Sequence, residues 1–325
     1  MRTRAFLLQS ASAAAAAAVG IGHAAAADVE GYGGPDYSGY TLSLEGGALF
    51  ANSVDVDKLG ISSGGPLLSG GSLNLNLDDD IGYYAGIRLG RRINQNWDVT
   101  LGAAVSRFLN NGTDDSLFFS GGSGSIGIQG SLKSDLDYTT LDFEVGYRPD
   151  GLADHDVRLF LGLRGLNSKD SLDKTGLLEI SGSGGSGGLA SFANGLDSEF
   201  LGIGPRAGAS FAHRFDNSSL GLSGMVAGAA IFGRRENDKT GDFSISSGFS
   251  GGTSVIFAGA DSETDKVYNL EGALGLDLYL GESSKLTVGA RAQKWWNIRG
   301  ADLGSGGSDE DQLSVGPFMM LETNF

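Results

Sequence analysis

Charged side chains recur at alternating positions inside apolar, glycine-rich segments of this chain. Seven are acids and six are arginines: Glu45, Asp98, Asp142, Glu144, Glu271, Asp277, Glu322, Arg88, Arg148, Arg158, Arg164, Arg206 and Arg291. If these segments are strands, their two-residue period places the charges on one face. Two kinds of chemistry then fit. The charges form a network of ion pairs that fills an enclosed interior, or they line a water-filled pore and set its ion selectivity. The residues alone leave both open.

Groups for the familiar kinds of nucleophilic catalysis are scarce. The chain has no cysteine and three histidines. His23 lies in a segment that we predict is removed, and His155 and His213 fall in short connections between predicted strands. Asp142 and Glu144 could exchange protons as acid and base, but two positions apart on one face they fit an interior lining better. We therefore expect no enzyme, no cofactor and no metal site.

Ten segments that would position these side chains have the period of a β-strand. In one of them Ile81, Tyr83, Ala85, Ile87 and Leu89 alternate with glycine, tyrosine and arginine. With about ten residues or more at ~3.3 Å each, every segment would cross the apolar layer of a bilayer. The segments are 40–50, 81–91, 96–108, 136–148, 157–166, 199–211, 219–233, 267–279, 285–296 and 312–325.

The connections between these segments alternate in length. The short ones are 92–95, 149–156, 212–218 and 280–284, and the long ones are 51–80, 109–135, 167–198, 234–266 and 297–311. Antiparallel neighbours would collect all long loops on one rim, which a soluble β-sandwich has no reason to do. The pattern predicts a transmembrane antiparallel up-and-down β-barrel of ten strands with short periplasmic turns. Twelve strands remain an alternative if one long loop also crosses the membrane.

Both ends of the chain agree with export to an outer membrane. Arg2 and Arg4 precede an alanine-rich apolar stretch, and small residues before Asp28 offer a cleavage site. The last segment alternates up to Phe325, and it resembles the terminal strands through which bacterial outer-membrane barrels are read by the barrel-insertion machinery. The predicted organisation is a signal peptide (1–27), a short periplasmic segment (28–39) and an outer-membrane barrel (40–325).

Composition and charge limit the partners. The mean hydropathy of −0.05 is too polar for a helical membrane protein, but it suits strands with one lipid face and one polar face. Loss of Arg2 and Arg4 would change the formal charge from −16 to −18, which argues against nucleic acid. The five long loops hold 22 acidic and 9 basic residues, so an acidic mouth would weakly prefer cations. Outer-membrane lipid and lipopolysaccharide are the expected partners, and oligomerisation is left open.

Three further patterns carry expectations. Asp78-Asp79-Asp80 lacks the ligand spacing of a calcium loop, so we interpret it as a solvated charge run. The Gly/Ser-rich long loops contain apolar residues at strand spacing, which predicts hairpins above the membrane, and Pro205 and Pro317 predict bulges in the wall. Aromatic residues near strand ends predict two membrane girdles: Tyr83, Trp97, Tyr147, Tyr279, Trp295 and Phe325.

Three segments resemble the pore-forming outer-membrane proteins typified by the Legionella major outer membrane protein. They are SLEGGALF at 43–50, LGIGPRAGASF at 201–211 and GPFMMLETNF at 316–325. The resemblance extends from about Gly39 to Phe325, but the cysteines of that family are absent here. It implies a porin-like channel for passive diffusion of ions and small hydrophilic solutes. The alternative is a closed structural barrel that acts in surface adhesion or envelope integrity.

Overall fold

The computed structural model describes residues 39–51, 80–109, 113–121, 124–149, 156–182, 187–216, 218–247, 250–299 and 311–325. The predicted signal peptide (1–27), nearly all of the segment 28–39, His155 and most of the run Asp78-Asp79-Asp80 lie outside these residues. No helix among the described residues is long and apolar enough to cross a membrane. The strands are β1 (Tyr40–Ala51), β2 (Asp80–Arg92), β3 (Trp97–Leu109), β4 (Thr113–Gly121), β5 (Gly124–Tyr147), β6 (Arg158–Gly182), β7 (Gly187–Arg214), β8 (Leu220–Ser247), β9 (Ser250–Tyr279), β10 (Ser284–Trp296) and β11 (Gln312–Asn324).

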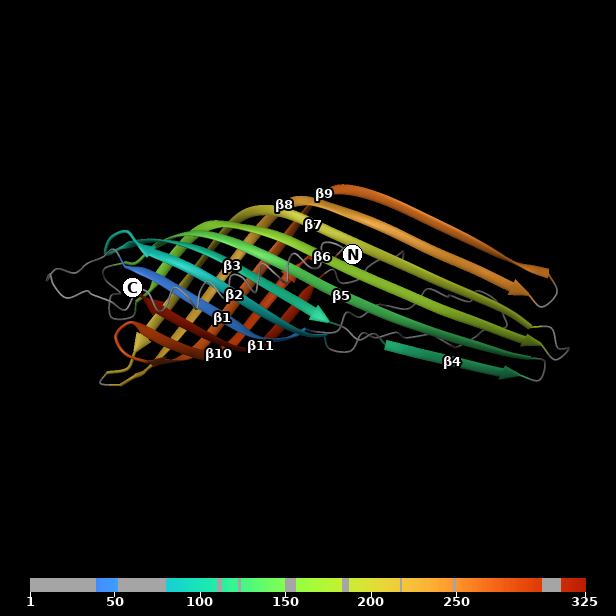
Figure 1. Cartoon of the computed structure of the whole chain (residues 1–325), viewed down its shortest axis with the longest axis horizontal. Coiled ribbons are helices and arrows are strands. Elements are labelled where there is room, and N and C mark those ends of the chain that lie inside the picture. The colour runs from blue at the N-terminus through green and yellow to red at the C-terminus, as the bar shows by residue number, and fades with distance from the viewer. Residues whose placement is uncertain are drawn as a thin grey trace.

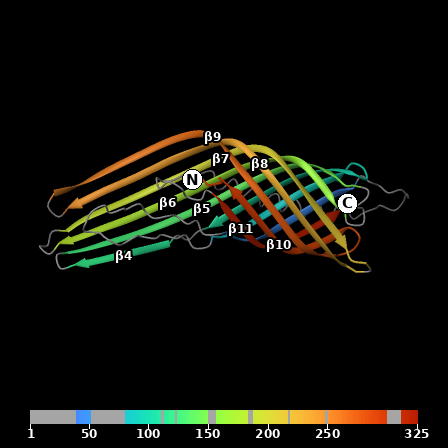
Figure 2. The ribbon, with the colours of Figure 1, turned by 180° about the vertical axis from the view of Figure 1, so that it is seen from behind.

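Ten of these strands form a closed antiparallel barrel. The sheet runs in the order β3-β2-β1-β11-β10-β9-β8-β7-β6-β5-β4, and pairing between β3 and β5 closes it. The ribbon views show the closed barrel at one end of the molecule (Figures 1 and 2). Only β4 stands outside the circle, paired with the outer part of β5. The predicted ten-stranded up-and-down barrel is confirmed.

The strand period sorts the side chains between the two faces of the wall. Leu101, Leu161 and Leu201 point outward and are 57%, 65% and 68% exposed, as lipid-facing residues of a barrel are when lipid is absent. Their neighbours in sequence are threonine, phenylalanine and glycine residues, and these lie on the inward face, as do the charged residues of the same strands. This alternation explains how a chain whose mean hydropathy is near zero forms an apolar belt around a polar interior.

The first and last strands close the wall of the barrel. The backbone N–H of Tyr40 donates to the carbonyl oxygen of Phe325 at 2.8 Å, and the reverse bond is 2.9 Å long. The rings of the two residues stack with centroids 6.1 Å apart. Nearby, the Thr41 hydroxyl donates to Asn324 Oδ1 at 2.7 Å. The carboxyl-terminal residue is therefore part of the closing contact of the barrel.

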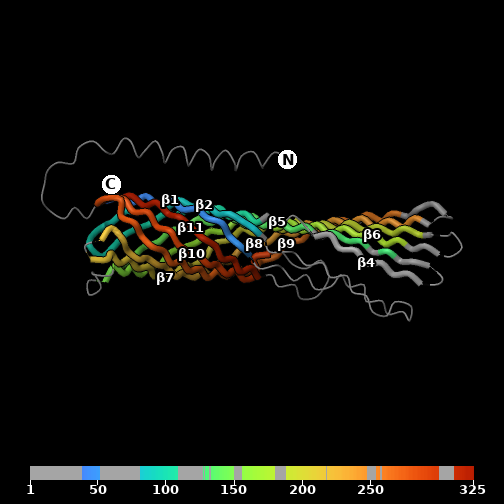
Figure 3. Tube along the Cα trace, turned by 90° about the horizontal axis from the view of Figure 1, so that it is seen from below, coloured from blue at the N-terminus to red at the C-terminus, as the bar shows by residue number. Residues whose placement is uncertain are grey.

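Five strands continue well past the barrel. β5 to β9 contain 24, 25, 28, 28 and 30 residues, whereas β1, β2, β3, β10 and β11 contain 12 or 13. Their outer parts form, together with β4, a six-stranded sheet that projects from the long-loop rim (Figure 3). The predicted hairpins are thus the continuation of the barrel strands, and no additional strand crosses the membrane within the described residues.

The predicted bulges at the two prolines are wrong. On either side of Pro205, Ile203 pairs with Phe232 and Arg206 with Ala229, so the register is unchanged. The ladder is interrupted over two residues because proline has no N–H to donate. The preceding Gly204 allows a close approach of strands, since an added Cβ would lie 1.8 Å from the carbonyl oxygen of Ala230. At Pro317 the pairing between β1 and β11 is interrupted in the same way without a shift.

Candidate functional site: the charged barrel interior

Glu271 lies at the centre of a buried ion-pair network in the barrel. It is 2% exposed and accepts hydrogen bonds from three arginines. Arg164 Nη2 contacts its Oε1 at 2.9 Å, Arg291 Nη2 contacts its Oε2 at 2.7 Å, and Arg206 contacts Oε1 as well. These arginines come from β6, β10 and β7, so the network connects opposite parts of the wall.

Each of these arginines also binds a second carboxylate. Arg164 forms a two-pronged pair with Asp142, with both N–O distances 2.7 Å. Arg206 pairs with Glu144, and Arg291 Nη1 lies 3.0 Å from Glu45 Oε1. Bidentate and charge-assisted contacts are the strong form of such pairs, and they compensate the cost of removing both charges from water.

The network continues toward the short-turn rim. Arg158 binds Glu144 at 3.0 Å and Asp98 at 2.8 Å, and Arg148 joins Asp98 to Asp156, the latter at 2.9 Å. On the other side, Arg88 lies 3.5 Å from the Glu45 carboxylate. The network thus contains six acids and six arginines: Glu45, Asp98, Asp142, Glu144, Asp156, Glu271, Arg88, Arg148, Arg158, Arg164, Arg206 and Arg291.

All eleven residues that we predicted to line a pore point into the barrel, and ten of them belong to this network. The eleventh, Asp277, accepts hydrogen bonds from Thr287 at 2.6 Å and from Ser223 at 2.8 Å. Lys285 lies 3.8 Å from Asp277 and 3.6 Å from Glu322. Sequence reasoning identified the inward side chains, but their convergence on Glu271 follows only from the closed barrel.

An apolar layer lies above the charges, on the side of the long loops. Nine of the ten barrel strands contribute at least one buried side chain to it: Leu49, Tyr84, Phe108, Leu136, Tyr138, Leu166, Phe200, Ile231, Val267 and Trp295. Phe318 of β11 lies lower, where its ring is close to Gly275 and Gly289 and lines the cavity near the short turns. On β5 the layer residues precede Asp142 and Glu144, and on β10 Trp295 follows Arg291, so both strands place the layer farther from the short turns. Sequence reasoning missed this layer. The sequence signal for this layer is that its aromatic and aliphatic residues lie an even number of positions from the inward charges of the same strand.

The segment that follows β10 folds into the barrel mouth. Ile298 is fully buried, and Arg235 donates to the carbonyl oxygen of Asn297 at 2.6 Å and to Asp265 Oδ2 at 2.6 Å. Arg299 Nη1 donates to the Ser134 hydroxyl at 2.6 Å. Asn297 has a φ of 58°, in the left-handed region that asparagine tolerates. These contacts fix Asn297–Arg299 above the apolar layer.

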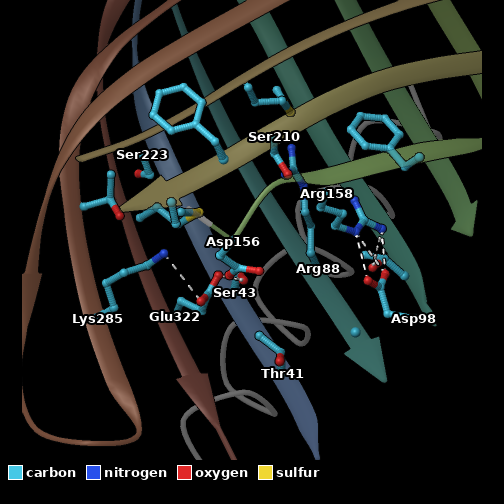
Figure 4. A pocket seen from close by; sticks show the side chains of 18 of the residues that line it. Thr41, Ser43, Arg88, Asp98, Asp156, Arg158, Ser210, Ser223, Lys285 and Glu322 are labelled. Carbon is cyan, nitrogen blue, oxygen red and sulfur yellow. Dashed lines mark hydrogen bonds and ion pairs between the residues drawn. The ribbon is translucent and has the colours of Figure 1, made fainter. Parts of the chain in front are cut away.

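A water-accessible cavity remains below the network. It has a volume of about 510 Å³ and is lined near the short-turn rim by residues of most barrel strands. Figure 4 shows Arg158 against Asp98 on one side and Lys285 against Glu322 on another. On both sides the charged groups are already paired with each other. We name this cavity the periplasmic vestibule; it ends at the charged network.

Five of the six aromatics predicted to form girdles lie at the outer face or the rim. Tyr83, Trp97, Tyr147 and Phe325 are 37% to 51% exposed, and Tyr279 is half-buried beneath Arg214. Trp295 is the exception, because it is 1% exposed and packs inside against Tyr138 with ring centroids 5.1 Å apart. Placing Trp295 in a girdle was wrong. It is four residues from the inward Arg291, so the two-residue period requires it to point inward too.

The remaining groups considered for catalysis are few. His213 lies near the end of β7 rather than in a turn, with its ring 5.7 Å from that of Phe215. Asp142 and Glu144 are both bound to arginines in the network. Within the described ranges, no group of three or more histidine, aspartate or glutamate side chains is arranged to hold a metal ion.

The closed wall, the lipid-facing apolar belt and the polar interior define an outer-membrane β-barrel. The family model described as the Legionella pneumophila major outer membrane protein precursor matches residues 70–322. The chain belongs to this family. No curated protein matches the chain.

Several solved structures match the chain at low identity. The outer membrane protease OmpT from Escherichia coli is 10% identical, with 91% of this chain and 99% of that chain covered and a TM-score of 0.35. Neisserial surface protein A is 11% identical, with coverages of 88% and 97% and a TM-score of 0.27. CarO from Acinetobacter baumannii is 12% identical, with coverages of 86% and 97% and a TM-score of 0.27.

Proposed function

We propose that this protein is a closed outer-membrane barrel that anchors an extracellular β-sheet, with a role at the cell surface such as adhesion or envelope integrity. The observation that carries this proposal is the apolar layer, to which nine of the ten barrel strands contribute. A diffusion pore needs a continuous polar path for water and solutes. A cluster of buried apolar side chains in the interior, on the long-loop side of Glu271, supports a closed barrel instead.

The length of the strands supports the same function. β5 to β9 carry their pairing far beyond the part that closes on β10 and β3. Maintaining a six-stranded sheet outside the membrane is unnecessary for a pore, whereas it holds a binding surface at a fixed height above the lipid headgroups. The buried ion pairs would then stiffen the barrel beneath this surface.

A channel for passive diffusion of ions and small hydrophilic solutes is the second candidate. The periplasmic vestibule favours it, because a cavity of about 510 Å³ already occupies the periplasmic part of the interior. Opening it to the outside would require displacement of the apolar layer and of the segment Asn297–Arg299. The acidic long loops would give such a channel a weak preference for cations.

Recordings from the refolded protein in planar lipid bilayers separate the two functions. We expect the wild-type barrel to be silent and a Phe108→Ser/Trp295→Ser variant, which replaces two large side chains of the apolar layer, to conduct. Leu141→Ala, on the lipid face, is the matched control and should stay silent, since Leu141 is 61% exposed outside the barrel. Stepwise wild-type conductance with cation selectivity would refute the closed barrel and establish the channel.

A further inference from the structure

The extracellular sheet ends in two free edges. One edge is β4, which pairs only with β5. The other is the outer part of β9, because β9 pairs with β10 only from Tyr268 onward. Among the described residues, no strand pairs with β9 on that side between Ser250 and Thr264, a length of about 50 Å at ~3.3 Å per residue. Figures 1 and 2 show β9 and β4 at opposite sides of the extension.

The first eleven residues of the β9 edge lack the features that usually prevent an edge strand from pairing. Residues 250–260 read SGGTSVIFAGA and contain no charge and no proline. Natural proteins commonly protect open edges with lysine, proline or short strands. Val255 and Ile256 are 53% and 76% exposed. Ile256 lies about 40 Å along the strand beyond Tyr268, at ~3.3 Å per residue, so the lipid that covers the barrel does not account for this exposure.

We propose that β9 of one molecule pairs with β4 of a second copy in the same membrane, so that the extracellular sheets join edge to edge. Strand direction supports this particular partner. β9 runs toward the short-turn rim, where it ends at Tyr279, whereas β4 runs antiparallel to β5 and therefore away from that rim. Copies inserted in one membrane share an orientation, so β9 meets a neighbouring β4 as an antiparallel pair.

The alternative contact, β9 with β9 of a neighbour, gives a parallel pair. Parallel pairing is slightly less stable per residue than antiparallel pairing. It would also leave both β4 edges open. The contact between β9 and β4 is heterologous, so it repeats from copy to copy into a ring or a row in the membrane plane.

The two edges also match in position and charge. Thr113 of β4 and Phe257 of β9 are the ends of one row of paired positions, which crosses the sheet through Leu132, Lys174, Asn194 and Gly241. β4 therefore occupies the same rows as the start of β9. In this register, Asp114 and Asp115 face the uncharged residues Ile256 and Val255, so no like charges meet across the contact.

Site-directed cross-linking tests the proposal. Because the chain has no native cysteine, only the introduced cysteines can react. A Ser116→Cys chain and a Ser254→Cys chain, with different tags, are expressed together in an outer membrane and treated with a short bismaleimide. We expect a covalent dimer that contains both tags. A Ser120→Cys chain in place of Ser116→Cys samples a register shifted along β4.

Charge at the edge provides the decisive comparison. Adding Ile256→Lys to the Ser254→Cys chain should lower the cross-linked fraction at least tenfold, because a lysine disfavours pairing at an edge. Leu189→Lys is the matched control and should leave the fraction unchanged, since Leu189 is also an exposed apolar residue but lies on the internal strand β7. Protease resistance of the barrel confirms folding of each variant.

Two results would overturn the proposal. The first is that neither β4 cysteine cross-links to Ser254→Cys although all chains are folded, which excludes the contact. The second is that Ser254→Cys chains cross-link to one another as efficiently as to the β4 variants, which indicates the parallel contact between two β9 strands. Neither result bears on whether the barrel conducts, so this inference and the proposed function fail independently.

Discussion

Replacement of Glu271 by glutamine removes one charge from the centre of the ion-pair network with little change in volume. The carboxylate is 2% exposed and accepts from Arg164, Arg206 and Arg291. Removing one partner from a buried pair typically costs about 3 to 5 kcal/mol, because a charge is left uncompensated. The question is which end of this range applies.

Here the surrounding charges favour the lower end. After the substitution each of the three arginines still has a carboxylate of its own, and these are Asp142, Glu144 and Glu45. No arginine is left alone, so the loss is spread over three weakened contacts. We expect Glu271→Gln to lower the free energy of unfolding by about 3 kcal/mol.

Urea unfolding of the barrel in lipid vesicles, followed by tryptophan fluorescence, measures this loss. Glu199→Gln is the matched control, because Glu199 pairs with Lys169 outside the barrel and the two side chains are 54% and 49% exposed. Exposed pairs contribute ~0 to 1 kcal/mol. If Glu271→Gln costs no more than Glu199→Gln, the interior charges are hydrated, and the reasoning that they fill a closed barrel is refuted.

Two further substitutions and one deletion test other parts of the structure. Arg235→Ala removes the donor that holds Asn297 in the barrel mouth. Because charged hydrogen bonds contribute about 1.5 to 3 kcal/mol, their loss should speed trypsin cleavage after Arg299 about tenfold or more. Unchanged cleavage would show that other contacts hold the segment. Gly204→Ala should cost at least about 3 kcal/mol, seen as a lower urea midpoint, because its Cβ would meet the Ala230 carbonyl oxygen; a midpoint equal to wild type would contradict the close approach. Deletion of Phe325, which removes its ring stacking on Tyr40, should lower the folded fraction in the outer membrane several-fold, as measured by protease resistance.

Most of the barrel was predictable because a two-residue period and alternating loop lengths are local properties of the chain. In the predicted segments 96–108 and 157–166, the two-residue period puts Leu101 and Leu161 on the face opposite the inward charges, and both lie on the outer face of the barrel. Hairpins were predicted in the Gly/Ser-rich long loops, but their continuity with the barrel strands β5 to β9 was not. Their pairing depends on neighbours that are far away in sequence, such as Gly124 with Gly182.

The candidate site was predictable only in part, and Trp295 shows why. Its position on β10 is fixed by the same parity as Arg291, but an aromatic residue near a strand end also fits a membrane girdle. The contact with Tyr138 on β5, which is 157 positions away in the chain, distinguishes the two. The bulges predicted at Pro205 and Pro317 were wrong for a related reason, because a missing N–H donor can be accommodated by an interrupted ladder as well as by a bulge.

The amino-acid sequence by itself determined that strands cross the bilayer, which face of each strand meets lipid, and which charges point inward. Tertiary structure alone decided what those inward side chains do. Ten strands close around a space narrow enough for arginines from β6, β7 and β10 to reach one carboxylate on β9, and for apolar residues of nine strands to meet above it. Whether inward charges line a pore or fill a core depends on the distance across the barrel, and a strand period carries no information about that distance.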